Sequence, residues 1–296
     1  MTIHCINCNN SKTSLYLKSF SIRFTDKKNY NLFECNKCRI IFTDFQDENY
    51  DKLYGQNYYK QNLIGKLFSF VSSILIILRL KFYRKSTGNI LDFGSGSGEF
   101  LRNIKNYSNF GTYGIEISSN AYANLVKEFG NNISNKDIRS MNPFNIKFDV
   151  VTIFHVLEHL SDPKEYLISI HNLMKENSIL LIEVPNINSL ESKLFGKYFF
   201  HLDLPRHIYH FNQHSLKNIL TESGFHNIRY VYSFSFFSFL LCPVYSYENF
   251  VKDTNNNIIK SLLKIIRIFV YPILLFFSLI TRITNSGPSI SVICKK

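Results

Sequence analysis

The sequence contains no tryptophan, only three methionines and few acidic residues. Its 22 aspartates and glutamates stand against 34 lysines and arginines, so the net charge is +12 over 296 residues. This excess of positive charge indicates an anionic partner, such as nucleic acid, a nucleotide-linked substrate or an acidic membrane surface. A generally lysine-rich proteome explains the charge equally well, and genomic base composition is a sufficient reason for the absent tryptophan.

A secretory signal, internal repeats and long low-complexity tracts are also missing. Where a signal peptide would have an apolar run, residues 4–8 read HCINC. We therefore expect a leaderless, cytoplasmic protein with reduced thiols. The length fits one ordinary catalytic domain plus a small addition, and 45% hydrophobic residues are ample for a buried core.

A glycine-rich segment, residues 89–101 with the sequence NILDFGSGSGEFL, is the most informative part of the chain. The order of its residues predicts a buried parallel strand, a tight turn and a helix that begins at once. Glycine permits a positive φ and a close approach of a ligand to the backbone. The helix N-terminus then offers free N–H groups to an acceptor.

Two classes of cofactor bind at such a turn. The dinucleotide fingerprint G-x-G-x-x-G has glycine where this chain has Glu99, and a carboxylate there would repel a pyrophosphate. The pattern acid-x-G-x-G-x-G instead resembles motif I of the class I S-adenosylmethionine (SAM)-dependent methyltransferases. SAM has no phosphate and carries a sulfonium cation, so a nearby acid is favourable. The resemblance implies that SAM is bound by Asp92, Gly94, Ser95, Gly96 and Gly98.

Further cofactor residues are expected at the ends of the following strands. Glu116 ends a short apolar strand 24 residues after Asp92, a spacing at which an acid accepts hydrogen bonds from ribose hydroxyls. The resemblance assigns Glu116 this role. It also places Asp137 at the adenine amino group and Ile138 beside the ring, although a surface-loop acid is the commoner explanation for Asp137.

Residues 148–186 closely resemble the corresponding region of small-molecule methyltransferases, with the signature HVLEHL.DP. Two apolar strands, 148–154 and 178–184, flank the segment from His155 to His159. His155 joins the cofactor-binding candidates, and Glu158 is interpreted as a helix charge. The resemblance implies an α/β fold: a Rossmann-like class I methyltransferase sheet, mostly parallel with the last strand antiparallel, a small N-terminal zinc ribbon and an apolar helical insertion.

Four N-terminal cysteines form two C-x-x-C pairs with short expected strands between them. Each pair can present two thiolates to one metal, and four thiolates make a closed tetrahedral zinc site. Disulfides are the alternative, which a reducing compartment disfavours. We therefore predict a structural Zn²⁺ bound by Cys5, Cys8, Cys35 and Cys38.

The methyl acceptor is less well defined. A ribbon before a methyltransferase domain resembles methyltransferases of bacterial sugars and surface glycans, and also ribosomal RNA methyltransferases. Enzymes that methylate base nitrogens typically carry an Asn/Asp-Pro-Pro-aromatic turn after the fourth strand, whereas residues 154–157 read FHVL. The basic residues are scattered, without the Lys/Arg-plus-aromatic run of an RNA-binding strand. These features favour a small or lipid-linked acceptor and make nucleic acid the lesser alternative.

A segment rich in histidine and aromatic residues, 195–211, follows the fifth strand. Methyl transfer to a hydroxyl requires a base, and histidine titrates near neutral pH. His207 is the first candidate, with His155 or His159 second. Arg206 could hold an acceptor phosphate, and Tyr59 is a further candidate at the substrate or above the cofactor. Structural roles in capping or packing are equally frequent for such histidines.

Two strongly apolar segments, 63–80 and 262–280, have uncharged cores shorter than the roughly 20 residues of a membrane-spanning helix. Basic residues flank both, which favours helices at an anionic membrane interface. The alternative is that they are buried on one another or in a dimer contact.

The predicted organisation is a zinc ribbon at 1–45, an aromatic linker and apolar helix at 46–85, and a methyltransferase domain at 86–296 with an insertion at 234–286. The predicted function is methyl transfer from SAM to a hydroxyl of a sugar or polyprenyl-linked glycan precursor, at the inner face of the membrane. The alternatives are a ribosomal or transfer RNA methyltransferase and a non-catalytic SAM-binding scaffold in glycan assembly.

Overall fold

The computed structural model describes residues 3–21, 28–43, 63–284 and 286–296. It divides into two compact units. The ribbon unit comprises Met1–Gln46, Pro185–Leu216 and Phe237–Ile290, and the sheet unit comprises Asp47–Val184, Lys217–Phe236 and Ser291–Lys296. The predicted insertion thus groups with the cysteine-rich N-terminus, whereas the apolar helix predicted as part of a linker belongs to the sheet unit.

The sheet unit is built on seven strands in the order β10-β11-β8-β7-β4-β5-β6. Strands β4 to β8 pair in parallel, and β10 pairs antiparallel with β11. The chain moves outward from β4 through β5 to β6 and then returns to the other side of β4, so a topological switch point lies between β4 and β7. The strands are β4 (Thr87–Phe93), β5 (Asn109–Ile115), β6 (Ile133–Ser134), β7 (Phe148–Phe154), β8 (Met174–Pro185), β10 (His226–Val231) and β11 (Ser289–Lys295).

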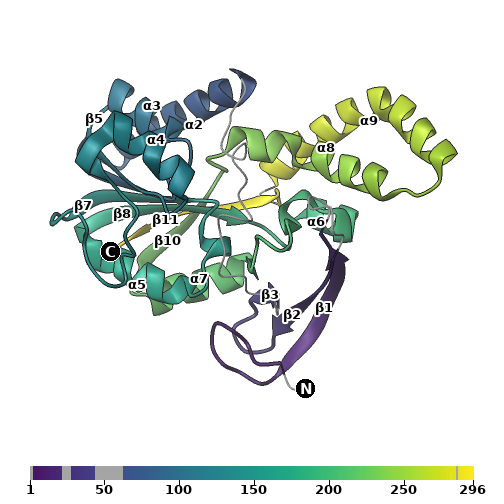
Figure 1. Cartoon of the computed structure of the whole chain (residues 1–296), viewed down its shortest axis with the longest axis horizontal. Helices are drawn as coiled ribbons and strands as arrows, with labels where there is room; N and C mark the ends of the chain where they lie inside the picture. The colour runs from purple at the N-terminus through teal and green to yellow at the C-terminus, as the bar shows by residue number, and fades with distance from the viewer. Residues whose placement is uncertain (1–2, 22–27, 44–62, 285) are drawn as a thin grey trace. The chain divides into compact units, whose positions relative to one another are not determined.

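Helices cover both faces of this sheet (Figure 1). On one face lie α2 (Leu63–Phe82), α3 (Glu99–Tyr107) and α4 (Ser119–Phe129). On the other lie α5 (Pro163–Leu173) and α7 (Gln213–Glu222). Short 3₁₀ helices, η1 (Gly130–Asn132) and η2 (Leu157–His159), follow α4 and β7. The predicted mostly parallel sheet with an antiparallel final pair is confirmed.

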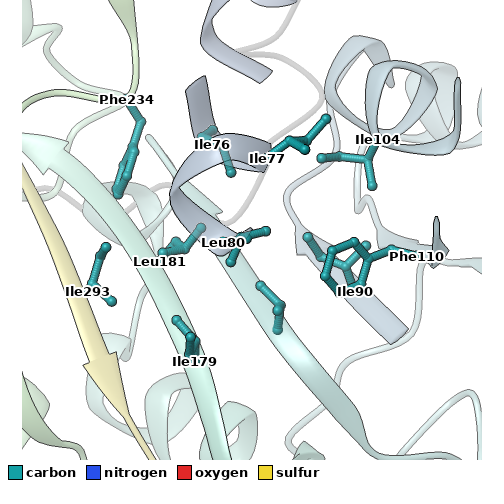
Figure 2. Close-up of a cluster of buried hydrophobic side chains, with 11 residues drawn as sticks. Ile76, Ile77, Leu80, Ile90, Ile104, Phe110, Ile179, Leu181, Phe234 and Ile293 are labelled. Atoms are coloured by element: carbon teal, nitrogen blue, oxygen red, sulfur yellow. The ribbon is translucent and has the colours of Figure 1, made fainter. Parts of the chain in front are cut away.

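The core of the sheet unit includes the C-terminal half of α2, as Figure 2 shows. Ile76, Ile77 and Leu80 are at most 5% exposed and pack with side chains from the central strands. Burial of one such side chain contributes roughly 1.5–3 kcal/mol. The other members of the cluster are Ile90, Ile104, Phe110, Val150, Ile179, Leu181, Phe234 and Ile293. Part of the apolar character of segment 63–80 is therefore explained by this core.

The ribbon unit contains a second sheet, of order β1-β2-β3-β9 and antiparallel throughout. Its strands are β1 (Thr13–Phe20), β2 (Asn29–Cys35), β3 (Ile41–Thr43) and β9 (Tyr209–His210). Its helices are α6 (Leu190–Phe195), η3 (Gly196–Tyr198), η4 (Phe200–Leu202), α8 (Phe236–Asp253) and α9 (Asn257–Ile283). Leu32 and Ile41 of the sheet share a core with Phe199, Leu202 and Cys242.

Candidate functional site

A cavity of about 330 Å³ opens at the carboxyl ends of β4, β5 and β7, beside the topological switch point. Its volume falls within the range of small-molecule sites, roughly 300–1,000 Å³. All the lining residues belong to the sheet unit. They are Phe93, Gly94, Gly96, Ile115, Glu116, Ile117, Ser118, Arg139, Phe154, His155, Val156, His159, Leu160, Ser161 and Tyr166.

The glycine-rich turn after β4 forms one wall of this cavity. Gly94 has a φ of +86°, and a Cβ there would lie 2.2 Å from Cγ2 of Val156. Gly98 is the N-cap of α3 with a φ of +79°, and its Cβ would lie 2.3 Å from Cδ2 of Leu125. Both positions require glycine, because an L side chain would be strained and would also clash. The turn therefore brings bare backbone to the cavity.

Glu116 lies opposite this turn and binds its backbone. Its Oε2 accepts a hydrogen bond of 2.7 Å from the Gly96 N–H, and its Oε1 accepts one of 2.8 Å from the Ser118 N–H. Ser118 is the N-cap of α4. The carboxylate is buried at the end of β5 and lines the cavity, which fits the predicted role as acceptor of ribose hydroxyls.

Asp92 lies behind the turn and is not among the lining residues. It is 4% exposed, and its Oδ1 accepts a hydrogen bond of 2.7 Å from the Thr152 hydroxyl. Burial raises the pKa of Asp92 to about 7; the Thr152 hydrogen bond opposes this shift and the charge of Glu116 adds to it. Ser95 caps the turn by donating to the Asp92 carbonyl at 2.9 Å. Asp92, Ser95 and Gly98 thus shape the site from behind.

The two residues predicted to contact adenine, Asp137 and Ile138, follow β6. Asp137 forms a bidentate ion pair with Arg139, with oxygen–nitrogen distances down to 2.6 Å, and this hydrogen bonding lowers the pKa of Asp137. Ile138 is buried. Neither lines the cavity, whereas Arg139 does, with its guanidinium 4.4 Å from the ring centroid of Tyr166.

His155 stands at the end of β7 between two buried carboxylates. Its Nε2 lies 3.1 Å from Glu183 and its Nδ1 lies 3.6 Å from Glu158, and both glutamates are fully buried. Burial alone would lower the pKa of His155, but hydrogen bonds and charges of the two glutamates outweigh it and raise the pKa to about 10. The raised pKa favours the imidazolium form of His155, which argues against its predicted role as a general base. Glu158, interpreted from sequence as a helix charge, is a buried partner of this histidine.

Glu183 anchors this cluster to the neighbouring strand and loop. Its carboxylate accepts hydrogen bonds from the Ser233 hydroxyl at 2.9 Å, from the Phe234 N–H at 2.6 Å and from the Ser291 hydroxyl. Burial would raise the pKa of Glu183, but His155 and the hydrogen bonds from Ser291 and Ser235 lower it to about 2. A backbone hydrogen bond links the same two residues. His155, which has a φ of +55°, donates its N–H to the Glu183 carbonyl at 2.9 Å.

The remaining candidates are divided between the units. His159 lines the cavity. Arg206 and His207 lie in the ribbon unit and are buried. Arg206 donates to Asp203 at 2.6 Å, so an acceptor phosphate would have to compete with that carboxylate, and His207 Nδ1 donates to the His201 carbonyl at 2.7 Å. Tyr59 lies outside the described residues.

The four N-terminal cysteines form a compact cluster in the ribbon unit. Their sulfurs lie within 4.8 Å of one another, with Cys5 and Cys38 at 3.7 Å and Cys8 and Cys35 at 3.6 Å. These distances are far longer than the S–S bond of about 2.0 Å in a disulfide. They match the roughly 3.8 Å edge of a tetrahedron with Zn–S bonds of about 2.3 Å. The thiols thus fit a single tetrahedral Zn²⁺.

The two C-x-x-C pairs also share one backbone geometry. Asn9 and Arg39, each directly after the second cysteine, have φ values of +56° and +60°. Each donates its N–H to the carbonyl of the first cysteine of its pair, at 2.8 and 2.9 Å. The sulfur of Cys35 also accepts hydrogen bonds from Lys37 N–H at 3.4 Å and from the Asn10 side chain at 3.6 Å. Such N–H···S contacts orient thiolate ligands.

Sequence reasoning missed three residues of the cavity region. Glu183 is a lone acid within a run of apolar strand residues, and that isolation was a usable signal for a buried functional charge. Arg139 follows Asp137 by two residues and binds the carboxylate that the predicted adenine contact would use. Tyr166 carried no signal, because an aromatic residue on a helix is ordinarily part of a core.

Comparisons with known proteins found solved structures that are similar to this chain. Phosphoethanolamine N-methyltransferase 2 of Haemonchus contortus, solved with S-adenosyl-L-methionine, superposes with a TM-score of 0.52 at 16% identity, covering 96% of this chain and 68% of that one. A SAM-dependent methyltransferase from Archaeoglobus fulgidus is 22% identical over 76% of this chain and 94% of its own, with a TM-score of 0.46. A search of curated proteins found no match.

A match to a protein family covers more than half of the chain. Residues 64–230 match the family described as "Methyltransferase domain". These residues include the glycine-rich turn, Glu116 and the histidine segment after β7. The chain therefore belongs to this methyltransferase family and is an enzyme of the SAM-dependent class I fold.

Proposed function

We propose that this enzyme transfers the methyl group of SAM to a hydroxyl of a sugar or glycan precursor, either small or lipid-linked. The observation that carries the proposal is the turn after β7. There the chain passes through His155, with a φ of +55°, into η2, and so lacks the Pro-Pro-aromatic turn typical of methylation at base nitrogens.

Transfer to a hydroxyl forms a bond between the acceptor oxygen and the methyl carbon while the carbon–sulfur bond of the cofactor breaks. The hydroxyl proton passes to a base, and S-adenosylhomocysteine leaves. Within the sheet unit, the glycine turn and Glu116 would position the cofactor, which is the main contribution expected of such an enzyme. An imidazolium cannot accept a proton, so a charged His155 would not be the base. Its ion pairs with Glu158 and Glu183 would instead fix its position in the cavity wall.

The general base is therefore sought among the other histidines. His159 lines the cavity, and His207 follows from the sequence pattern. The backbone carbonyl bound to Nδ1 of His207 fixes the proton on that nitrogen in the neutral ring. Its Nε2 would then be the proton acceptor. Arg206 remains the proposed contact for an acceptor phosphate, in exchange for its ion pair with Asp203.

The test is release of S-adenosylhomocysteine with a panel of acceptors: nucleotide sugars, polyprenyl-linked saccharides and unmodified ribosomal and transfer RNA. We expect turnover with a saccharide and a new methoxy signal in the NMR spectrum of the product. Turnover only with RNA would establish the RNA alternative, and SAM binding without turnover on any acceptor would favour the scaffold. His159→Ala and His207→Ala identify the base, because only its loss removes the acidic limb of the pH–rate profile.

We also propose that the cysteine cluster holds a structural Zn²⁺ and that the protein works in the cytoplasm. Support comes from the sulfur spacing, which fits four thiolates on one ion and no disulfide. A reducing compartment keeps such thiols available to the metal.

A further inference from the structure

Helix α9 exposes a long apolar surface in the ribbon unit. Ile258, Leu262, Ile265, Phe269 and Phe276 are 55–73% exposed. With about 100° between successive residues of a helix, these five positions lie on one side of α9. Ile268, Ile273, Leu279 and Ile280 extend the same surface and are 41–70% exposed. None of these described side chains carries a charge. Exposed apolar patches of this extent mark interaction sites.

The opposite side of α9 is packed within its own unit. Leu274 joins Val244, Tyr247 and Val251 of α8 in a buried cluster. The Ser278 hydroxyl donates to the Leu240 carbonyl at 3.0 Å, and the Thr281 hydroxyl donates to Glu191 of α6 at 2.7 Å. Polar and apolar contacts thus fix the rotation of α9 about its axis, and the apolar surface faces outward.

Positive charge borders this surface. Lys264 and Arg282 lie along one edge of α9, between the packed side and the apolar surface, whereas Lys260 and Arg267 lie on the side opposite the apolar surface; the helix contains no acidic residue. The acids of α8 have partners of their own: Glu248 accepts from the Tyr271 hydroxyl, and Asp253 accepts from the Tyr198 hydroxyl at 3.1 Å. An apolar face with a basic border is complementary to a bilayer with anionic headgroups.

We propose that α9 lies flat in the interface of an anionic membrane, with this apolar surface inserted among the acyl chains. The helix is long and apolar enough to cross a bilayer by length and composition. Its uncharged stretch, 268–281, has only 14 residues, however, against the roughly 20 that a spanning segment needs. A spanning helix would also expose Ser278, Thr281 and their partners to lipid. Membrane attachment is independent of the acceptor and of catalysis.

The absence of tryptophan makes a background-free test possible. Single-tryptophan variants Leu262→Trp, Phe269→Trp and Phe276→Trp place a reporter at three points along the apolar surface, and Tyr16→Trp on β1 is the control. With phosphatidylglycerol vesicles, the three α9 reporters should shift their emission to the blue and the control should not. Brominated lipids should quench the three α9 reporters to a similar degree, because a flat helix holds them at one depth.

Quenching that is deepest at position 269 and shallow at 262 and 276 would show a spanning helix instead, since these ends lie about 20 Å apart along the axis. No emission shift with vesicles would overturn the proposal. A concentration-dependent shift without lipid would show that a second copy of the chain covers the surface, and would overturn it equally.

The basic border is tested separately. Lys264→Ser and Arg282→Ser should each weaken binding to anionic vesicles roughly fivefold, and Arg267→Ser, on the opposite side of the helix, should weaken it less. Affinity for SAM, which we propose binds in the sheet unit, should stay unchanged, and an unchanged melting temperature reports that the variants are folded. Vesicle binding that is insensitive to the first two substitutions and to salt would contradict the electrostatic part of the proposal.

Discussion

At the residue scale, two buried acids flank the glycine-rich turn. Glu116 is satisfied by two backbone N–H groups, whereas Asp92 has one hydroxyl partner and a pKa near neutrality. A cation bound nearby favours the ionised form of a carboxyl group. We therefore expect Asp92 to couple the affinity for the sulfonium cation to pH.

The first prediction concerns this coupling. Because the pKa of Asp92 is raised to about 7, the group is mostly protonated at pH 6 and ionised at pH 8. Affinity for SAM should rise roughly tenfold between these pH values. Affinity for S-adenosylhomocysteine, which lacks the cation, should rise much less. Titration calorimetry with both ligands measures this, and Asp92→Asn should remove the difference. A parallel rise for both ligands would show that Asp92 does not sense the sulfonium.

The second prediction concerns Glu183 and His155. The pKa of Glu183 is lowered to about 2, so its stabilisation is present above about pH 4.5 and is lost as pH falls. The pKa of His155 is raised to about 10, so its stabilisation is present below about pH 6.5 and is lost as pH rises. The pair thus stabilises most between these limits.

Glu183→Gln should lower the free energy of unfolding by roughly 3–5 kcal/mol at pH 5.5, because it removes the closer of the two carboxylates that pair with the His155 charge. The loss should shrink at pH 10. Denaturant unfolding at both pH values provides the measurement. A loss of equal size at both would mean that the hydrogen bonds of Glu183, and not its charge, are what stabilise the fold.

Residue positions were predictable from sequence where spacing fixes them. Glu116 follows from its distance to the glycine turn and lies on the cavity wall. Asp137 could not be predicted in the same way, because Arg139 captures its carboxylate in a contact that depends on rotamers. His155 was identified as a cavity residue, but its charge state depends on Glu183, a residue 28 positions away.

At the scale of elements, the turn between β4 and α3 is determined by glycine geometry, and it supplies the third prediction. Gly94→Ala should destabilise the protein by about 1–3 kcal/mol through its positive φ, and should weaken SAM binding further because the new Cβ overlaps Val156.

The contact and the strain can be separated by a double-mutant cycle. Val156→Ala removes the overlapping methyl groups, so the double variant should regain part of the SAM affinity lost in Gly94→Ala but not the stability lost to strain. Calorimetry and thermal unfolding of the four proteins provide the two readouts. Additive losses in affinity would contradict a steric origin.

Element types were largely predictable because the sheet strands are continuous apolar runs between turn residues. The strand predicted at 178–184 extends over Met174–Pro185, and the apolar helices predicted at 63–80 and 262–280 are α2 and α9. Periodicity could not reveal which side of each helix is packed. Ile76, Ile77 and Leu80 turn out to be core, whereas the apolar surface of α9 is exposed.

At the scale of the whole molecule, the chain crosses between its two units several times. Segments 185–216 and 237–290 leave the sheet unit and join the cysteine-rich N-terminus. The sequence-based prediction was a domain at 86–296 with an insertion at 234–286. The grouping of segments into units could not be predicted, because composition does not reveal which segments share a core. The cluster of Leu32, Phe199 and Cys242 shows this long-range association.

The fourth prediction is that the ribbon unit depends on zinc. Purified protein should contain about one zinc per chain by elemental analysis, and Cys35→Ser should lose it, because a three-thiolate site binds zinc more weakly. Cys294→Ala, which changes a cysteine outside the cluster, should keep the metal. A chelator should lower the melting temperature of the wild type. Zinc-free protein with unchanged stability would show that the thiols pack without a metal.

The central claim is that SAM binds between the glycine turn and Glu116 at the carboxyl ends of β4 and β5. A crystal structure of the protein with S-adenosylhomocysteine tests it most directly. We predict electron density in the cavity, with the ribose hydroxyls at Glu116 and the backbone of Gly94 and Gly96 against the ligand. Density for the ligand at another site, or a glycine turn closed on the Glu116 side chain at saturating ligand, would contradict the account.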